Sequence, residues 1–234
     1  MGGAEFDKAY ARLARLLSGN YNTARATVIR ESVLGCPDEG IEYARYRLAG
    51  GGCLYGLKET AMLVRKLGVD VGEHPDCGAV RVYLQRVKGI KAPTMKQVDD
   101  AAVEWSRTVA AMAGQKVVSM ELHRPAHHDA VCLYYDGTGK MTSCEGLPRG
   151  FIVSRSILPR DYATREVVTL AEIAFAHGFN DYFTHEQPFY LVGVGKDENH
   201  SRELQEELAE HAVPQLMISE QARTKTARIH LRAA

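Results

Sequence analysis

Short apolar runs and longer amphipathic stretches follow one another along the chain. Apolar residues recur at helical spacing and predict helices at residues 6–17, 57–67, 79–87, 98–113, 167–176 and 201–212. Runs rich in β-branched residues predict strands at residues 26–34, 69–71, 116–122, 130–135, 139–142, 189–194 and 227–231. A hairpin-like turn at Asp136-Gly137 is expected to join the strands at 130–135 and 139–142. This alternation predicts an α/β fold, a three-layer domain with a central, mostly parallel sheet flanked by helices.

Length and charge narrow the class of protein. A chain of 234 residues can bury a full core, and we expect an N-terminal helical arm at 1–25 followed by one α/β domain at 26–234. The 29 basic side chains balance 29 acidic ones, which gives no reason to expect a nucleic-acid or membrane partner. Apolar stretches such as 189–194 are too short to span a bilayer, and the start of the chain lacks a secretory pattern. We therefore expect a cytoplasmic protein.

The cysteines indicate metal chemistry. Five cysteines without an export signal make a disulfide framework improbable. Cys36 follows the first predicted strand, and His74 and Cys77 follow the second, so both loops lie at strand ends, where open α/β sheets place their sites. Two thiolates and one imidazole form a three-ligand zinc site whose fourth position is open. The alternative for each cysteine taken alone is a small buried apolar side chain.

These residues carry a resemblance to a known family. Cys36-x-Asp38, Leu48-Ala-Gly-Gly, Gly56-Leu-Lys-Glu-Thr-Ala and His74-x-x-Cys77-Gly-Ala together resemble the β-class carbonic anhydrases. The resemblance implies that family's fold, Zn²⁺ (or Cd²⁺ or Co²⁺) held by Cys36, His74 and Cys77, and Asp38 as the gating acid. It also implies interconversion of carbon dioxide and bicarbonate through a metal-bound hydroxide. Residues 114–135 look more like the related cadmium-type enzymes of diatoms.

One departure from the family pattern keeps alternatives open. The family places Arg two positions after the acid, where this chain has Gly40, and Arg45 or Arg47 would have to reach Asp38 instead. Without that pairing Asp38 would close the metal site, leaving a non-catalytic metal-binding module. Hydrolysis of CS₂ or COS is a further alternative with the same metal chemistry. The family also implies a homodimer through the N-terminal helix, against the alternative that its apolar stripe packs on its own chain.

The other candidate clusters favour structural interpretations. A His-rich stretch suggests a loop between strands, with proton transfer as the functional alternative; it comprises His123, His127, His128 and Asp129. Cys132 and Cys144 are expected to be packing or surface thiols. Residues 51–60 approach a phosphate-binding loop, but Leu57 and Glu59 interrupt the required Gly-Lys-Thr, so nucleotide binding is not expected.

Overall fold

The structure is a computed structural model of the whole chain. It describes residues 30–38, 44–121, 132–137, 141, 150–155, 158–176, 190–194 and 230–233. The chain divides into two compact units, residues 28–125 and residues 126–234 together with 1–27, and each is described by itself. The predicted N-terminal arm, 1–25, lies outside the described residues.

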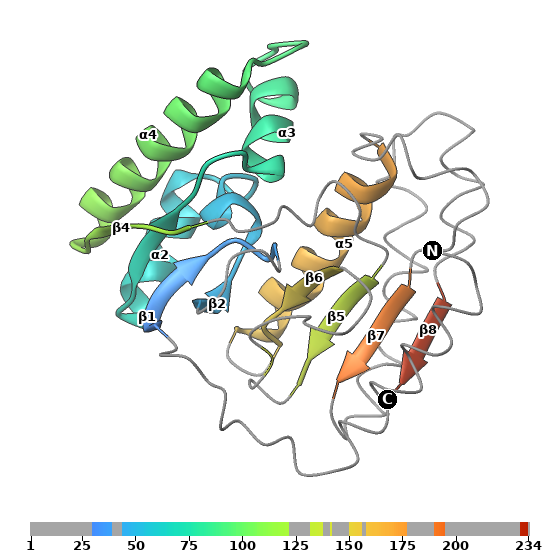
Figure 1. Cartoon of the computed structure of the whole chain (residues 1–234). Helices are drawn as coiled ribbons and strands as arrows, with labels where there is room; N and C mark the ends of the chain where they lie inside the picture. Colours follow the sequence, from blue (N-terminus) through green and yellow to red (C-terminus); the bar gives the residue numbers. More distant parts are fainter. Residues whose placement is uncertain are drawn as a thin grey trace. The chain divides into compact units, whose positions relative to one another are not determined.

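The unit formed by residues 28–125 is built on a parallel four-stranded sheet (Figure 1). Its strands, in the order β2-β1-β3-β4, are β2 (Ala44–Arg47), β1 (Arg30–Gly35), β3 (Asp70–Glu73) and β4 (Val117–Ser119). After β1 the chain continues to β2, which lies on one side of the β1–β3 pair in the sheet. After β3 it continues to β4, which lies on the opposite side of that pair. The carboxyl ends of β1 and β3 therefore form a topological switch point, the place where open α/β sheets bind ligands.

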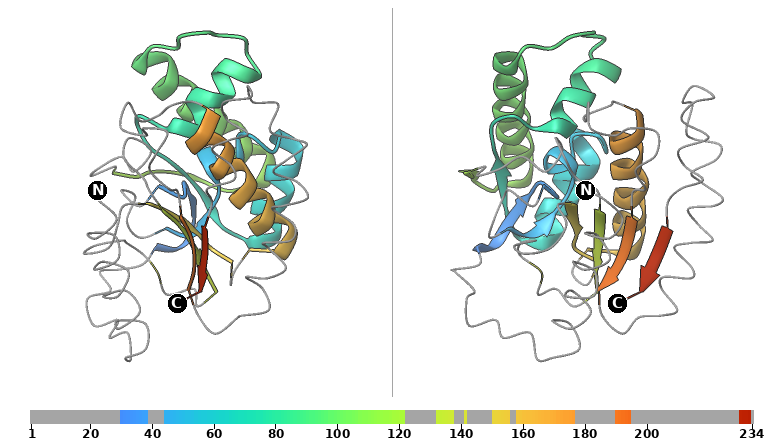
Figure 2. Two further views of the ribbon diagram at one scale, coloured as in Figure 1. Left: turned by 90° about the vertical axis from the view of Figure 1, so that its right-hand side faces the viewer. Right: turned by 45° about the vertical axis from the view of Figure 1, so that its right-hand side comes forward.

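Helices cover this sheet. They are the short 3₁₀ helix η2 (Ala49–Gly52), α2 (Leu57–Leu67), α3 (Gly78–Arg86) and α4 (Met95–Ala113). The long helix α4 packs on β3, α2 and α3, and Figure 2 shows α3 and α4 side by side. The core between sheet and helices is made of branched apolar side chains with at most 2% exposure, including Val33, Leu34, Val64, Val71, Val98 and Val109.

The second unit repeats the same order of strands. Its elements are β5 (Cys132–Asp136), β6 (Gly150–Val153), α5 (Arg160–Ala176), β7 (Tyr190–Val194) and β8 (His230–Ala233). The sheet order is β6-β5-β7-β8, all neighbouring strands are parallel, and α5 packs on β5 and β6 (Figure 1). The α/β class predicted from the sequence, with a mostly parallel sheet and flanking helices, is confirmed.

Most predicted elements within the described residues are present with shifted ends. Helix α2 coincides with its predicted range, whereas α4 begins at Met95 because Thr94 and Gln97 form a capping box that starts the helix earlier. Strands β2 and β6 were not expected. The predicted helices at 6–17 and 201–212 lie outside the described residues. Among the helices that are described, none has both the length and the apolar character to cross a membrane.

The predicted hairpin after β5 is wrong. Met141, the described residue of the expected second strand at 139–142, is not in a strand, and its N–H donates to Asp136 Oδ2 at 3.0 Å. The reason is that β5 pairs with β6 on one edge and with β7 on the other, both parallel. No hydrogen-bonding edge of β5 is left for a hairpin partner.

The close packing around β3 makes a stability prediction at Gly72. A Cβ there would overlap Met120 Sδ and lie 3.0 Å from the Leu34 carbonyl oxygen. Gly72→Ala should therefore lower the free energy of unfolding in urea by about 1–3 kcal/mol. In the double variant with Met120→Ala, the loss should be smaller than the sum of the two single losses, because the sulfur contact is gone. Additive losses would contradict the proposed overlap.

Candidate metal centre

Three side chains that can ligate a metal meet at the switch point between β1 and β3. Cys36 directly follows β1, His74 directly follows β3, and Cys77 is the N-cap residue of α3. The parallel register pairs Leu34 with Val71, which brings the two strand ends level with each other. The two sulfurs and a ring nitrogen all lie within 4.8 Å of one another, and all three residues are buried. This spacing suits one ion with zinc–sulfur bonds of about 2.3 Å and a zinc–nitrogen bond of about 2.0 Å.

A tight turn carries the chain from His74 back to Cys77. Asp76 in this turn has φ of 49°, a left-handed conformation that Asp tolerates better than most residues. Its N–H donates to Asp99 Oδ1 of α4 at 2.8 Å, and its carboxylate lies 3.7 Å from the Arg81 guanidinium of α3. Both neighbouring helices therefore hold the turn that positions Cys77.

The imidazole of His74 is oriented for ligation. Its Nδ1 lies 2.7 Å from the Pro75 carbonyl oxygen, which can only accept, so Nδ1 carries the proton and donates it. Nε2 then presents a lone pair, and it is buried without a hydrogen-bond partner among the described residues. Metal-ligating histidines use this same arrangement, with the distal nitrogen donating to a carbonyl or carboxylate. The residues present thus fit a metal ion.

Without metal, Cys36 and His74 hold their protons to higher pH than these groups ordinarily do. The pKa of the Cys36 thiol is raised well above its ordinary value by its hydrogen bond with Cys77 and by burial. Burial lowers the pKa of His74, but Cys36, the Asp38 carboxylate and the Pro75 carbonyl together raise it by more than burial lowers it. The pKa of His74 is therefore raised overall. Metal binding must displace these protons.

Arg47 at the end of β2 supports the cysteine loop from inside. Its side chain is fully buried, and Nη1 donates to the carbonyl oxygens of Cys36 at 3.1 Å and of Asp38 at 2.8 Å. Of the two arginines expected to reach Asp38, Arg47 does so through the main chain, whereas Arg45 is exposed on the same strand. Asp38 is buried, but its carboxylate is not part of the group of three ligand atoms.

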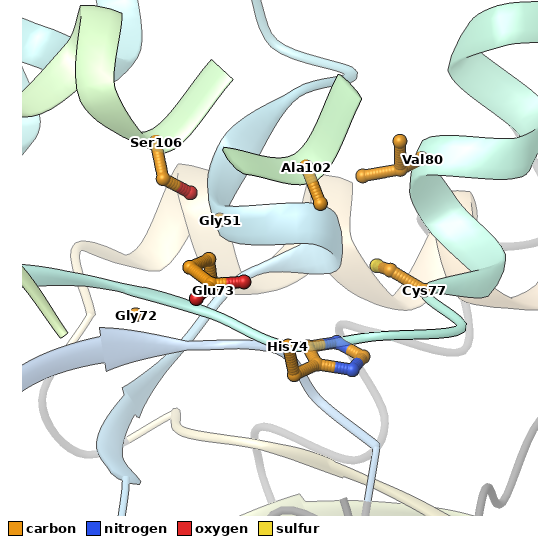
Figure 3. Close-up of a pocket in the computed structure, with 8 residues that line it drawn as sticks. All are labelled: Gly51, Gly72, Glu73, His74, Cys77, Val80, Ala102 and Ser106. Atoms are coloured by element: carbon orange, nitrogen blue, oxygen red, sulfur yellow. The ribbon is translucent and has the colours of Figure 1, made fainter. Parts of the chain in front are cut away.

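A small pocket opens beside His74 and Cys77 (Figure 3). Its empty space, counted with the part open to solvent, is about 210 Å³, so the pocket is small. The walls come from η2, β3, α3 and α4 and comprise Gly51, Gly72, Glu73, His74, Cys77, Val80, Ala102 and Ser106. Trp105 of α4 donates its indole N–H to the Gly51 carbonyl oxygen at 3.4 Å and so ties η2 to α4 across the pocket.

The other predicted site residues are not brought to this centre in the described part of the chain. The His-rich stretch, with His123, His127, His128 and Asp129, lies outside the described residues, as does Cys144; Cys132 is the first residue of β5. The loop that resembled a phosphate-binding loop forms η2 and the start of α2. Glu73 and Ser106 were not expected at the pocket, and only the position of Glu73 beside His74 could have indicated it.

Comparisons of the chain with protein-family models, with curated proteins and with solved structures find no match. The resemblance to the β-class carbonic anhydrases therefore rests on the residues of this sequence alone and stays a prediction.

The buried contacts of Arg47 predict an effect on metal binding. Arg47→Met removes both hydrogen bonds to the cysteine loop, so zinc affinity should fall by about 10–100-fold, as for other residues that support metal ligands. The matched control is Arg45→Met on the same strand, which should leave the affinity unchanged because Arg45 is exposed. Competition with a zinc chelator measures both. Equal affinities for the two variants would show that Arg47 does not hold the site.

The raised pKa values predict how zinc affinity depends on pH. A ligand that keeps its proton to higher pH makes the metal compete with that proton, so affinity must rise as pH rises. Between about pH 6 and 8 we expect a gain of at least about tenfold per pH unit, one released proton or more. Chelator competition across this range, with the proton release followed by a pH indicator, tests this. A flat profile would contradict thiol and imidazole ligation.

Proposed function

We propose that this protein is a zinc-dependent carbonic anhydrase that interconverts carbon dioxide and bicarbonate. The observation that carries the proposal is the buried group of Cys36, His74 and Cys77, with an unpartnered His74 Nε2, beside a small pocket. Three protein ligands leave a zinc ion one open position, which is the mark of a catalytic rather than a structural site. When bound, zinc supplies a Lewis acid that lowers the pKa of water from about 15.7 toward about 7.

The chain's own residues suit a small uncharged substrate. Val80 and Ala102 give the pocket apolar walls, which are compatible with carbon dioxide because it donates no hydrogen bond. We assign Asp38 the role of a hydrogen-bond acceptor that orients the attacking oxygen. Arg47 is then a positioning residue. It donates hydrogen bonds to the Cys36 and Asp38 carbonyls, and we propose that these bonds keep the Asp38 carboxylate beside the metal rather than bound to it.

Thiolate-rich sites favour zinc and cadmium over harder ions, and cobalt can replace zinc in them. We propose zinc as the resident metal, because its borderline softness suits a mixed set of two sulfurs and one nitrogen. Cadmium or cobalt is the alternative.

A second candidate function has one observation in its favour. Asp38 is 1% exposed, and its charge lies close enough to His74 to raise the imidazole pKa. A short movement of this carboxylate onto the metal would close the fourth position and leave a non-catalytic metal-binding module. The two functions are separated by activity, because both bind metal.

Exchange of oxygen isotopes between carbon dioxide and water tests the proposal. The zinc-loaded wild type should catalyse the exchange at about neutral pH. Asp38→Asn should retain zinc and lose about 10²–10⁴-fold in rate. The reason is that a neutral amide accepts hydrogen bonds more weakly than a carboxylate and does not take up a proton. Cys36→Ser should lose zinc and activity together.

The matched control is Asp100→Asn on α4, whose carboxylate is exposed and pairs with Lys96. This variant should keep wild-type zinc content and rate. A zinc-loaded wild type that shows no exchange up to about pH 9 overturns the enzyme and leaves the closed module. Full zinc content in Cys36→Ser would overturn the ligand assignment itself.

A further inference from the structure

Glu73 brings a negative charge into the pocket beside the metal ligands. It is the last residue of β3, one position before His74, and it is only partly exposed. Figure 3 shows its carboxylate in the pocket, with Ser106 and Ala102 of α4 on the other side. Within the described part of the chain this carboxylate forms no hydrogen bond or ion pair. Its charge is therefore not neutralised by a neighbour there.

An uncompensated carboxylate in a partly enclosed pocket acts strongly on other charges. The remaining walls are apolar or uncharged except for the ligands, so they carry no charge that could screen it. At a separation of about 8 Å and an effective dielectric constant of about 30, repulsion between two negative charges weakens binding roughly tenfold. A neutral molecule of the same size feels no such penalty.

We propose that Glu73 makes this pocket selective for uncharged small molecules by weakening the binding of small anions at the metal centre. This inference rests on the proposed metal site and names the class of ligand that it admits. Under the proposed reaction, uncharged carbon dioxide enters freely, whereas bicarbonate and inorganic anions are held weakly and leave readily. Glu73 is thus a specificity-determining residue and not one of the three ligands.

Azide binding to the cobalt-loaded full-length protein tests the proposal. Cobalt held by thiolates absorbs visible light, and a small anion entering its coordination sphere changes that absorption. We expect Glu73→Gln to bind azide about tenfold more tightly than the wild type, because it removes the charge and keeps the shape. The cobalt spectrum before azide is added should be the same for both proteins.

One control variant separates the charge in the pocket from charge elsewhere on the protein. Glu104→Gln removes an exposed carboxylate of α4 outside the pocket. It should bind azide as the wild type does.

The outcomes distinguish this inference from the proposed metal site. If cobalt gives no thiolate spectrum, the metal site and the inference fail together. If the spectrum is present but Glu73→Gln binds azide as the wild type does, the metal site stands and the inference is overturned. A cobalt spectrum that changes in Glu73→Gln without azide also overturns it, because Glu73 would then be a ligand.

Discussion

The parallel pairing of β1 with β3 is the constraint on which the site depends. These neighbouring strands send their connections in opposite directions, so the loops that leave their carboxyl ends diverge at this point of the sheet. Cys36 and His74 are the first residues past those ends, and the turn at Asp76 adds Cys77. Backbone pairing therefore fixes two ligands before any metal binds, and little conformational entropy is left to lose on binding.

A buried guanidinium maintains this arrangement. Burying the charge of Arg47 is costly, and the carbonyls of Cys36 and Asp38 offset part of that cost by accepting hydrogen bonds from Nη1. The arginine thus links the edge strand β2 to the loop that carries Cys36 and Asp38.

The second unit has the same strand order as the first, and the three-ligand group lies in the first unit.

The grouping of Cys36, His74 and Cys77 could be predicted from the sequence because these residues are chemically distinctive and lie in short loops directly after predicted strands. Arg47 was also expected near Asp38, but its hydrogen bonds to main-chain carbonyls and the position of Ser106 could not be predicted. Strand β2 reads Ala-Arg-Tyr-Arg, only four residues of which two are charged, and it forms because it pairs with β1. Ser106 reaches the pocket only through the packing of α4 on β3. The start of α4 at Met95 could have been predicted from Thr94 and Gln97, which have the spacing of a capping box.

We propose that one metal ion is held by two sulfurs and one imidazole from two strand ends. X-ray absorption spectroscopy of the zinc-loaded full chain tests this set of ligands, because it reports the atoms bound to zinc. We expect sulfur neighbours at about 2.3 Å together with nitrogen or oxygen neighbours at about 2.0–2.1 Å. A first shell of nitrogen and oxygen alone, or zinc lost on dialysis against buffer, would contradict it.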